Sequence, residues 1–575
     1  MGFFEILDAI NGVIWHNAVL YIVLGVGVLF TIWSGFCQYK AMTHGVQVTR
    51  GVYDNHDDPG AINHFQALSA ALSATVGLGN IGGVALAISL GGPGAVFWMW
   101  MVGLVGMALK TTEVTLSMMY RKLDEHGEPH GGPMFVAREG FEKMGLGWLG
   151  RLVGGTFVFT LLIAAITGGN MFQAWNVADV SYTSFGIPQE LTGVVLTVLV
   201  GIVIIGGLRR IGRVTEKLVP LMCLMYLLAA FIVVFMNIGK IPDLLRLIVA
   251  EAFTPTKAEG AFLGGTAGYA LLWGMKRALF SSEAGQGSSP IAHAVAKTDE
   301  PVREGVVAGL EPFIDTLVVC TLTTLVILST GVWNRPADLK FASPPAITAA
   351  ATEGQWTLEK TRLIVPEDKP ESVTVGFTVF TVVSAHENPS TGEKLHRTHG
   401  KLTHSDQQWY VEWSAFASPQ QPTVHSPGAF FDFQGASLTK AAFDAAIPGL
   451  GKWLVPISAW LFALSTIISW SYYGEQGVVY LFGNRAILPY KIIYCALVLV
   501  SCLPALIRTD AQLDSLTALG TGIMLWANIP IMLIFGKQAM DAYHDYFRRL
   551  NAGEMEKPHE ARTLVDLLEE KPDED

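Results

Sequence analysis

Long apolar runs are the feature that most limits what this chain can fold into. A helix needs about 20 mainly apolar residues to cross the hydrocarbon core of a bilayer, and the sequence contains eleven such stretches. They are Ala18–Phe36, Phe65–Leu90, Pro93–Met119, Leu152–Trp175, Leu191–Gly207, Leu218–Ile238, Phe262–Ala284, Val306–Val332, Leu454–Gly477, Ile487–Leu506 and Leu513–Phe535. The sequence therefore predicts an all-α integral membrane protein with eleven transmembrane helices.

The composition excludes several other classes of protein. Charged residues make up only 15% of the 575 residues, against about 25% in soluble proteins. The net charge of −11 repels phosphate backbones, so we expect no nucleic-acid partner. The sequence has neither a G-x-x-x-x-G-K-[ST] phosphate loop nor an H-E-x-x-H metal motif. We therefore expect no enzyme activity and no organic cofactor, and the sequence leaves the oligomeric state open.

Lysine and arginine set the expected orientation, because they concentrate in cytoplasmic loops. With the N-terminus outside, the inner segments hold 21 of these residues and the short outer loops hold 4. The sequence therefore predicts a multi-pass protein of the plasma (bacterial inner) membrane, with the N-terminus outside and the C-terminus in the cytoplasm.

A polar region of about 120 residues, 333–452, separates two of the spans and falls outside the membrane. It contains alternating apolar residues, which are typical of strands: Val373, Val375, Phe377 and Val379, then Trp409, Val411 and Trp413. We expect an inserted β-rich extracytoplasmic domain here. The predicted organisation is an N-terminal accessory helix and cytoplasmic loop (1–60), core helices 1–7 (61–332), the inserted domain (333–452), core helices 8–10 (453–537) and an acidic cytoplasmic tail (538–575).

Two of the apolar stretches are interrupted by a Gly-x-Gly motif, at Gly77/Gly79 and at Gly285/Gly287. Glycine disfavours helix and bares the backbone, which membranes tolerate only where the backbone is covered by protein or lines a cavity. Paired interruptions in two halves of a chain indicate a transporter site near the midplane. Once the N-terminal span is set aside, the two breaks fall in core helices 1 and 6, which predicts an inverted 5+5 repeat.

Charged residues inside the spans are costly, and each one is a functional hypothesis. Lys110 and Glu113 are spaced to pair with each other on one helix. Glu283 and Asp315 are expected partners for the cations Lys276 and Arg277, and a proton-coupling carboxylate is the alternative role for this pair of acids.

The sequence around both breaks resembles a known family. Thr75-Val-Gly-Leu-Gly-Asn-Ile-Gly-Gly-Val-Ala85, Gly169-Asn-Met-Phe-Gln173, Phe280-Ser-Ser-Glu-Ala-Gly-Gln-Gly-Ser-Ser-Pro290 and Phe462-Ala-Leu-Ser-Thr466 are similar to segments of the alanine or glycine:cation symporter family, which includes the sodium:alanine symporters. The resemblance covers about 63–332 and 454–535. It implies the leucine-transporter fold and uptake of small neutral amino acids coupled to sodium or sometimes to protons. The inserted region 333–452 is a departure from the usual pattern of the family.

The resemblance also implies roles for single residues. By similarity, the amides of Leu78 and Gly79 would hold the substrate carboxylate, and the Thr75 carbonyl would take its ammonium. The expected sodium ligands are the carbonyls of Ser73 and Val76 and the hydroxyls of Ser465 and Thr466. The whole set expected to bind substrate is Thr75, Gly77, Leu78, Gly79, Asn80, Asn170, Gln173, Trp273, Phe280 and Ser281.

The sequence thus favours a secondary active symporter that imports a small neutral amino acid, alanine or glycine, together with sodium. Three alternatives stay open at this point. They are coupling to protons instead of sodium, a channel, and a sensor in which the region 333–452 binds a ligand.

Overall fold

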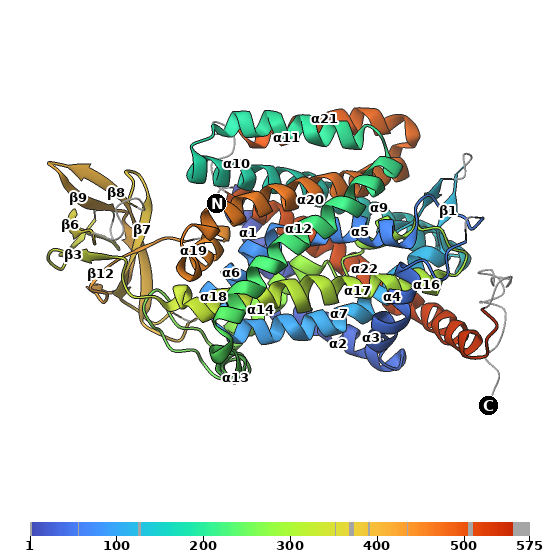
Figure 1. The fold of residues 1–575 in the computed structure, drawn as a ribbon, viewed down its shortest axis with the longest axis horizontal. Helices are drawn as coiled ribbons and strands as arrows, with labels where there is room; N and C mark the ends of the chain where they lie inside the picture. The colour runs from blue at the N-terminus through green and yellow to red at the C-terminus, as the bar shows by residue number, and fades with distance from the viewer. Residues whose placement is uncertain are drawn as a thin grey trace.

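The computed structural model describes residues 3–555, apart from 56, 125–127, 351, 353, 367–372, 389–390, 434 and 504–509. The last part of the predicted tail, 556–575, lies outside the described residues, while 538–551 continue the last helix. Most of the chain is helical, and in Figure 1 the long helices run side by side along the longest axis. The strands between residues 339 and 431 lie at one end of this axis, whereas strand β1 (Lys122–Leu123), which pairs with β2 (Pro129–His130), and the C-terminus lie near the other.

Helices occupy the segments before and after the strands. The main ones before the strands are α1 (Phe3–Ile14), α2 (Asn17–Trp33), α5 (His64–Thr75), α6 (Val84–Gly91), α7 (Gly94–Met119), α8 (Pro133–Lys143), α9 (Gly147–Ile166), α10 (Phe172–Phe185), α11 (Gln189–Ile204), α12 (Leu208–Met236), α13 (Ile241–Glu251), α14 (Ala267–Ser282), α15 (Ser289–His293), α16 (Pro301–Ala308), α17 (Leu310–Pro312) and α18 (Thr321–Thr330). After the strands follow α19 (Ala436–Ala446), α20 (Leu450–Phe482), α21 (Ile487–Ser501) and α22 (Asp510–Asn551). Wider π-helical turns interrupt this pattern at η2 (Gly79–Gly83), η3 (Thr167–Met171) and η5 (Phe313–Cys320).

Fewer helices meet a criterion of length and apolar composition than the eleven spans predicted. Among the described residues, eight helices are long and apolar enough to cross a membrane, or nine if the bent pair His64–Thr75 and Gly79–Gly91 counts as one span. The predicted spans 191–207 and 262–284 coincide with α11 and α14, each of 16 residues. A helix of that length reaches only about 24 Å at 1.5 Å per residue, which is short of a 30 Å hydrocarbon core.

The segment between α18 and α19 holds strands β3 (Leu339–Phe341), β4 (Ile347–Ala349), β5 (Gln355–Leu358), β6 (Thr361–Ile364), β7 (Thr378–Ser384), β8 (Leu395–Ser405), β9 (Gln408–Trp413), β10 (Phe416–Ala417), β11 (Thr423–Val424) and β12 (Gly428–Phe431). The largest sheet has the order β11-β7-β12-β3-β6-β9-β8, and β8 also pairs with β7. This extra pairing closes six antiparallel strands into a ring, which leaves fewer strand edges exposed. Apolar side chains such as Leu339, Val379 and Val411 fill the inside.

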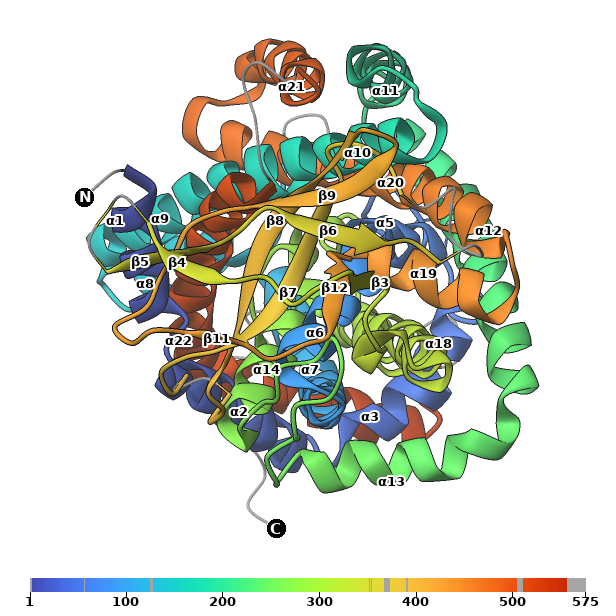
Figure 2. The ribbon, with the colours of Figure 1, turned by 90° about the vertical axis from the view of Figure 1, so that its left-hand side faces the viewer.

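The last part of the region 333–452 is not made of strands. It is α19, and the Thr439 hydroxyl on this helix donates to the Ile81 carbonyl at 2.9 Å. Gly82 lies so close to α19 that an added Cβ would meet the Ala436 nitrogen at 3.0 Å. Figure 2, seen from the strand end, shows α19 and α18 beside each other among the helices. Helix α19 therefore packs on the broken helix α5–η2–α6 and is part of the helical body.

Candidate functional site

The first helix break lies where α5 stops at Thr75 and η2 begins at Gly79. Asn80 stabilises this break, because its Oδ1 accepts a hydrogen bond from the Gly77 amide at 2.8 Å. The backbone N–H of Asn80 in turn donates to the Gly77 carbonyl at 3.1 Å. The chain bends by 51° between the two halves. A buried polar side chain thus replaces backbone hydrogen bonds that the helix gives up at the glycines.

The side-chain amide of Asn80 also ties the break to two other helices. It donates to the Ser281 hydroxyl at 3.1 Å and to the Asp315 carboxylate at 2.5 Å. Ser281 itself donates to the same carboxylate at 3.0 Å. All three residues are buried. Asp315 therefore accepts hydrogen bonds from two of the residues predicted to bind substrate, and it fixes both of them in place.

The second break follows Ser282, the last residue of α14. Glu283, Gly285 and Gly287 have φ angles of 53°, 78° and 82°, which lie in the left-handed region that favours glycine. An added Cβ at Gly287 would meet Pro133 Cγ at 2.4 Å. Gly287 is therefore required both by its backbone conformation and by close packing, and a new helix starts only at Ser289.

Uncharged oxygen atoms from the end of α5, at the first break, and from α20 lie close together. The Ser73 carbonyl accepts hydrogen bonds from Thr466 at 3.1 Å and from Ser465 at 3.4 Å. The Ser73 hydroxyl donates to the Ser465 carbonyl at 2.8 Å. Val76 lies at the C-cap of α5 in the same stretch, and its side chain is buried. Three of the four predicted sodium ligands thus contact one another, and a hydroxyl that now donates can turn a lone pair toward a cation.

A small cavity of about 30 Å³ lies beside this cluster of oxygens. Of the residues predicted from sequence, it is lined by Thr75, Gly77, Gly79, Gln173, Phe280, Ser281 and Thr466. We call it the central pocket. Its size is about that of two water-sized groups, so this conformation holds a nearly closed site.

Other residues of the central pocket escaped the sequence analysis. They are Ala74, Ala164, Gly168, Gln286, Trp470, Thr517 and Thr521, and Glu283, which the sequence predicts as an ion-pair partner or a proton-coupling carboxylate and not as a substrate contact. Gln173 Oε1 and Gln286 Oε1 are buried and accept no hydrogen bond from the described residues. The spacing of Thr517 and Thr521 by one helical turn in an apolar span was the available signal for these two.

Several predicted substrate residues lie elsewhere. The Asn170 amide donates to the Tyr494 carbonyl at 2.8 Å, and Asn170 does not line the central pocket. Trp273 lines a separate, larger cavity. Leu78 and Asn80 are buried in the first break next to pocket residues without lining the pocket themselves.

Buried charges form a second polar region on neighbouring helices. His293 joins two carboxylates through its ring nitrogens, with Nδ1 at 2.5 Å from Glu304 and Nε2 at 2.8 Å from Glu311. The other Glu304 oxygen pairs with His64 Nδ1, and Lys110 Nζ lies 3.4 Å from Glu311 and 3.8 Å from Glu113. The Lys110–Glu113 pair predicted from spacing is therefore present, with a closer partner from another helix. We call the set the ionic chain: His64, Lys110, Glu113, His293, Glu304 and Glu311.

Comparisons with known proteins agree with this picture. The model of the sodium:alanine symporter family matches residues 2–365 and 424–561. The sodium/alanine symporter AgcS of Methanococcus maripaludis is 34% identical over 494 residues, which cover 86% of this chain and 87% of that protein. The putative sodium/proton-dependent alanine carrier protein YrbD of Bacillus subtilis is 31% identical over 553 residues, covering 96% of this chain and 93% of that protein. The probable sodium/glutamine symporter GlnT of Bacillus subtilis is 35% identical over 358 residues, 61% of this chain and 71% of that protein.

The family match spans both helix breaks, α20 and α22. Residues 366–423, between its two ranges, lie in the strand-rich segment. The family and the relatives named above are membrane transporters rather than enzymes, and the resemblance read from the two glycine motifs is confirmed. This chain belongs to the sodium:alanine symporter family of membrane proteins.

Proposed function

We propose that this chain is a secondary active symporter that imports a small neutral amino acid, alanine or glycine, together with sodium. One observation carries the proposal: Thr466 belongs to both parts of the site. Its hydroxyl lies in the cluster of oxygens with Ser73 and Ser465, and the same side chain lines the central pocket. An added Cβ on Gly77 would meet Thr466 Oγ1 at 3.0 Å. Ion and substrate would therefore share one side chain, which provides a direct route for coupling.

The chemistry of the oxygens supports sodium as the transported cation. Ser73, Ser465 and Thr466 offer carbonyl and hydroxyl groups only, and Val76 adds a carbonyl in the same stretch. Divalent cations prefer sites that include carboxylates. A sodium ion driven inward gains about 2.3 kcal/mol per 100 mV of membrane potential before any concentration gradient is counted.

The central pocket supports a small zwitterionic substrate. Its small volume and the side chains of Phe280 and Trp470 leave little room for a large side chain. The side-chain oxygens of Gln173 and Gln286, which accept no hydrogen bond from the described residues, are acceptors for an ammonium group. The probable glutamine symporter among the relatives makes a longer side chain the competing substrate class, which the experiment below includes.

Glu283 favours proton coupling as a second candidate. Its carboxylate lines the central pocket and accepts a hydrogen bond from Ser288. A carboxylate at this place is able to take up and release a proton with each cycle.

For the architecture, we propose eleven spans in which α11 and α14 are the two short ones, with an inverted 5+5 core of the leucine-transporter type. The N-terminus and the strands β3–β12 would lie outside the cell and the C-terminus in the cytoplasm, as the 21 to 4 bias of lysine and arginine requires. The domain limits expected from sequence are kept, except that α19 is assigned to the core because it packs on the first break.

Reconstituted protein in liposomes tests the proposal. Uptake of labelled alanine, glycine and glutamine is measured with an inward sodium gradient at equal pH, and again with an inward proton gradient without sodium. We expect alanine or glycine uptake that needs sodium. Glutamine uptake alone would overturn the substrate, uptake driven only by protons would overturn the ion, and rapid flux without any ion gradient would indicate a channel. A folded protein that moves no amino acid would support the sensor.

A further inference from the structure

A second and larger cavity lies next to the central pocket. It has a volume of about 400 Å³ and is lined by α1, by the start of α2, by α14 and by α22. We call it the α1 cavity. Volumes of this size are typical of small-molecule sites. The N-terminal helix α1 is outside the two predicted repeats, so the resemblance of the core does not account for this cavity.

The two cavities are lined by the same pair of helices, α14 and α22. On α14, Phe280 lines the central pocket, whereas Trp273 and Lys276 line the α1 cavity. On α22, Thr517 lines the central pocket and Asp514 lines the α1 cavity. On α14 the step from Lys276 to Phe280 is about one helical turn, whereas on α22 the residues of the two cavities overlap along the helix, since Ala518 also lines the α1 cavity.

Arg277 lies at the boundary between them. Its guanidinium group is 5.5 Å from the centre of the Trp273 ring and 5.7 Å from that of Phe280. The same group lies 3.7 Å from the Asp514 carboxylate. Arg277 therefore contacts residues of both cavities.

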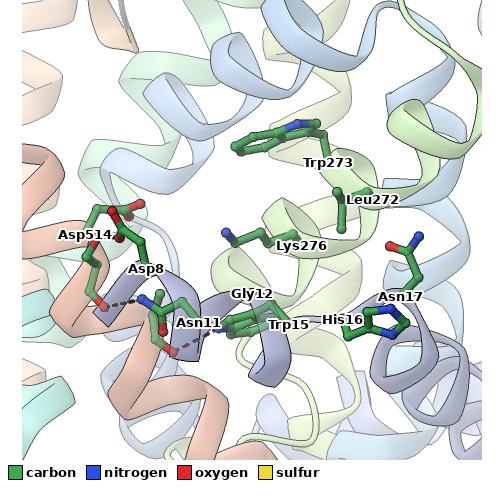
Figure 3. Close-up of a pocket in the computed structure, with 12 residues that line it drawn as sticks. Asp8, Asn11, Gly12, Trp15, His16, Asn17, Leu272, Trp273, Lys276 and Asp514 are labelled. Carbon is green, nitrogen blue, oxygen red and sulfur yellow. Dashed lines mark hydrogen bonds between the residues drawn. The ribbon is translucent and has the colours of Figure 1, made fainter. Parts of the chain in front are cut away.

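The α1 cavity carries opposite charges on opposite walls. Lys276 extends from α14 toward Asp8 on α1 and Asp514 on α22 (Figure 3). Lys276 forms no ion pair with any described carboxylate, although the charges of both aspartates act on it. Asp8 is held in place by the Ser515 hydroxyl, which donates to it at 2.7 Å. Lys276 thus faces two aspartates with which it forms no ion pair, while Asp514 is paired with Arg277.

Asn11 adds a neutral acceptor to the anionic wall. Its amide nitrogen donates to the Ser515 carbonyl at 2.8 Å. Its Oδ1 is buried and accepts no hydrogen bond from the described part of the chain, and the whole residue is only 9% exposed. A buried acceptor without a donor is costly, so Asn11 and the two aspartates favour a ligand that brings N–H groups.

We propose that the α1 cavity is a second binding site for zwitterionic amino acids. Lys276 holds the α-carboxylate, and Asp8, Asp514 and Asn11 hold the α-ammonium group. Because the α1 cavity is far larger than the central pocket, it accepts side chains that the central pocket excludes. It would capture amino acids ahead of the central pocket, and in this respect the inference rests on the proposed transport function.

Binding of labelled L-leucine to the purified full-length protein in sodium buffer tests the inference without requiring transport. We expect saturable binding to the wild type, at least tenfold weaker binding to Lys276→Gln and to Asp8→Asn, and unchanged binding to the matched control Lys452→Gln, a change at an exposed lysine. Propylamine and propionate, each carrying one of the two charges, are expected not to compete. A thermal melt of each variant shows that it is folded, and Lys276→Arg is expected to keep the binding.

Three results would overturn the inference. They are the absence of leucine binding to the wild type, wild-type affinity in Lys276→Gln, and loss of leucine binding in Thr466→Ala, since that loss would place leucine in the central pocket. Failure of the proposed function is recognised separately, by the absence of alanine uptake into liposomes while leucine binding and its dependence on Lys276 persist.

Discussion

The central pocket and the ionic chain are both polar and buried, but they are built from opposite kinds of groups. The cluster of oxygens beside the pocket uses hydroxyls and carbonyls, which are joined by hydrogen bonds of 2.8 to 3.4 Å. The ionic chain uses titratable side chains, and each lies close to one or more of the others, for example at 2.5 Å between His293 and Glu304 and at 3.8 Å between Lys110 and Glu113. Neutral groups can exchange one partner for a cation at small cost, whereas a buried charge that loses its partner is strongly destabilising. The difference indicates that the pocket is suited to exchange and the ionic chain to a fixed structure.

The position of the ionic chain agrees with this division. His64 begins α5, the first half of the first broken helix, and His293 ends α15, the helix after the second break. Glu304 on α16 joins them by contacting both imidazoles. The ionic chain therefore holds the ends of the two broken helices together, while the breaks themselves stay adaptable.

The largest effect is expected from Glu304→Ala. This change leaves His64 and His293 without their shared carboxylate inside the protein, and breaking such a buried pair costs about 3–5 kcal/mol. Thermal unfolding in detergent should show a strongly destabilised protein. The control is Glu412→Ala, which removes an exposed pair with Lys360 at 3.0 Å and is expected to cost about 1 kcal/mol at most. Equal shifts in the two variants would contradict a structural role for the ionic chain.

Thr466→Ala is the matching test for the ion cluster. The loss of one hydroxyl ligand to a cation is worth about 1.5–3 kcal/mol, or roughly a tenfold to hundredfold change at about 1.4 kcal/mol per decade. We expect the sodium concentration for half-maximal alanine uptake to rise by that factor, with little change in thermal stability. Thr330→Ala removes a hydroxyl that bonds only within its own helix and should leave the sodium requirement as it was. An unchanged requirement in Thr466→Ala would refute the assignment of the ion site.

Gln173→Ala and Asn170→Ala compare a residue that lines the central pocket with one that does not. Gln173 lines the central pocket with an unpaired oxygen, so its loss should raise the alanine concentration for half-maximal uptake by about tenfold, near the upper end for one hydrogen bond. Asn170 bonds to the Tyr494 carbonyl on α21 instead, and its loss should mainly lower the melting temperature. Uptake measured against alanine concentration, together with a melt, compares the two. A larger effect of Asn170→Ala on the alanine requirement would reverse the placement of these residues.

This last pair also shows what the sequence could and could not predict. Asn170 and Gln173 are spaced i, i+3, which places two residues on one face of a regular helix. Here a π-helical turn, η3, spans Thr167–Met171 and widens the helix at that point. The two side chains consequently contact different neighbours. No local sequence pattern predicts such a π-helical turn.

Contacts between residues far apart in the sequence are the second limit on what could be predicted. The glycine motifs correctly located both breaks because glycine acts locally on the backbone. Spacing alone also located the Lys110–Glu113 pair, but the closer partner Glu311 lies on a helix about 200 residues further along. The strand predicted from the alternation of Trp409, Val411 and Trp413 is present as β9, whereas Val373, Val375 and Phe377 precede β7 instead of forming it. Cross-strand pairing, which decides where a strand begins, is not contained in the alternation itself.

The smallest effect is expected from removing the strands. In the sheet, Leu339 pairs with Ala429, so the two ends of the segment 339–431 lie side by side and a short glycine-serine linker can join them. The variant keeps α19, since Thr439 donates to the Ile81 carbonyl beside the first break. It loses the contact of Arg397 with the Ala261 carbonyl, which lies in the loop that leads into α14.

Because neither the central pocket nor the ionic chain includes a residue of the strands, sodium-driven alanine uptake should stay within about twofold of the wild type, less than the factor of about five that 1 kcal/mol produces. A larger loss in protein that still melts cooperatively would mean that the strands take part in transport, and the division between an adaptable pocket and a fixed frame would then have to include them.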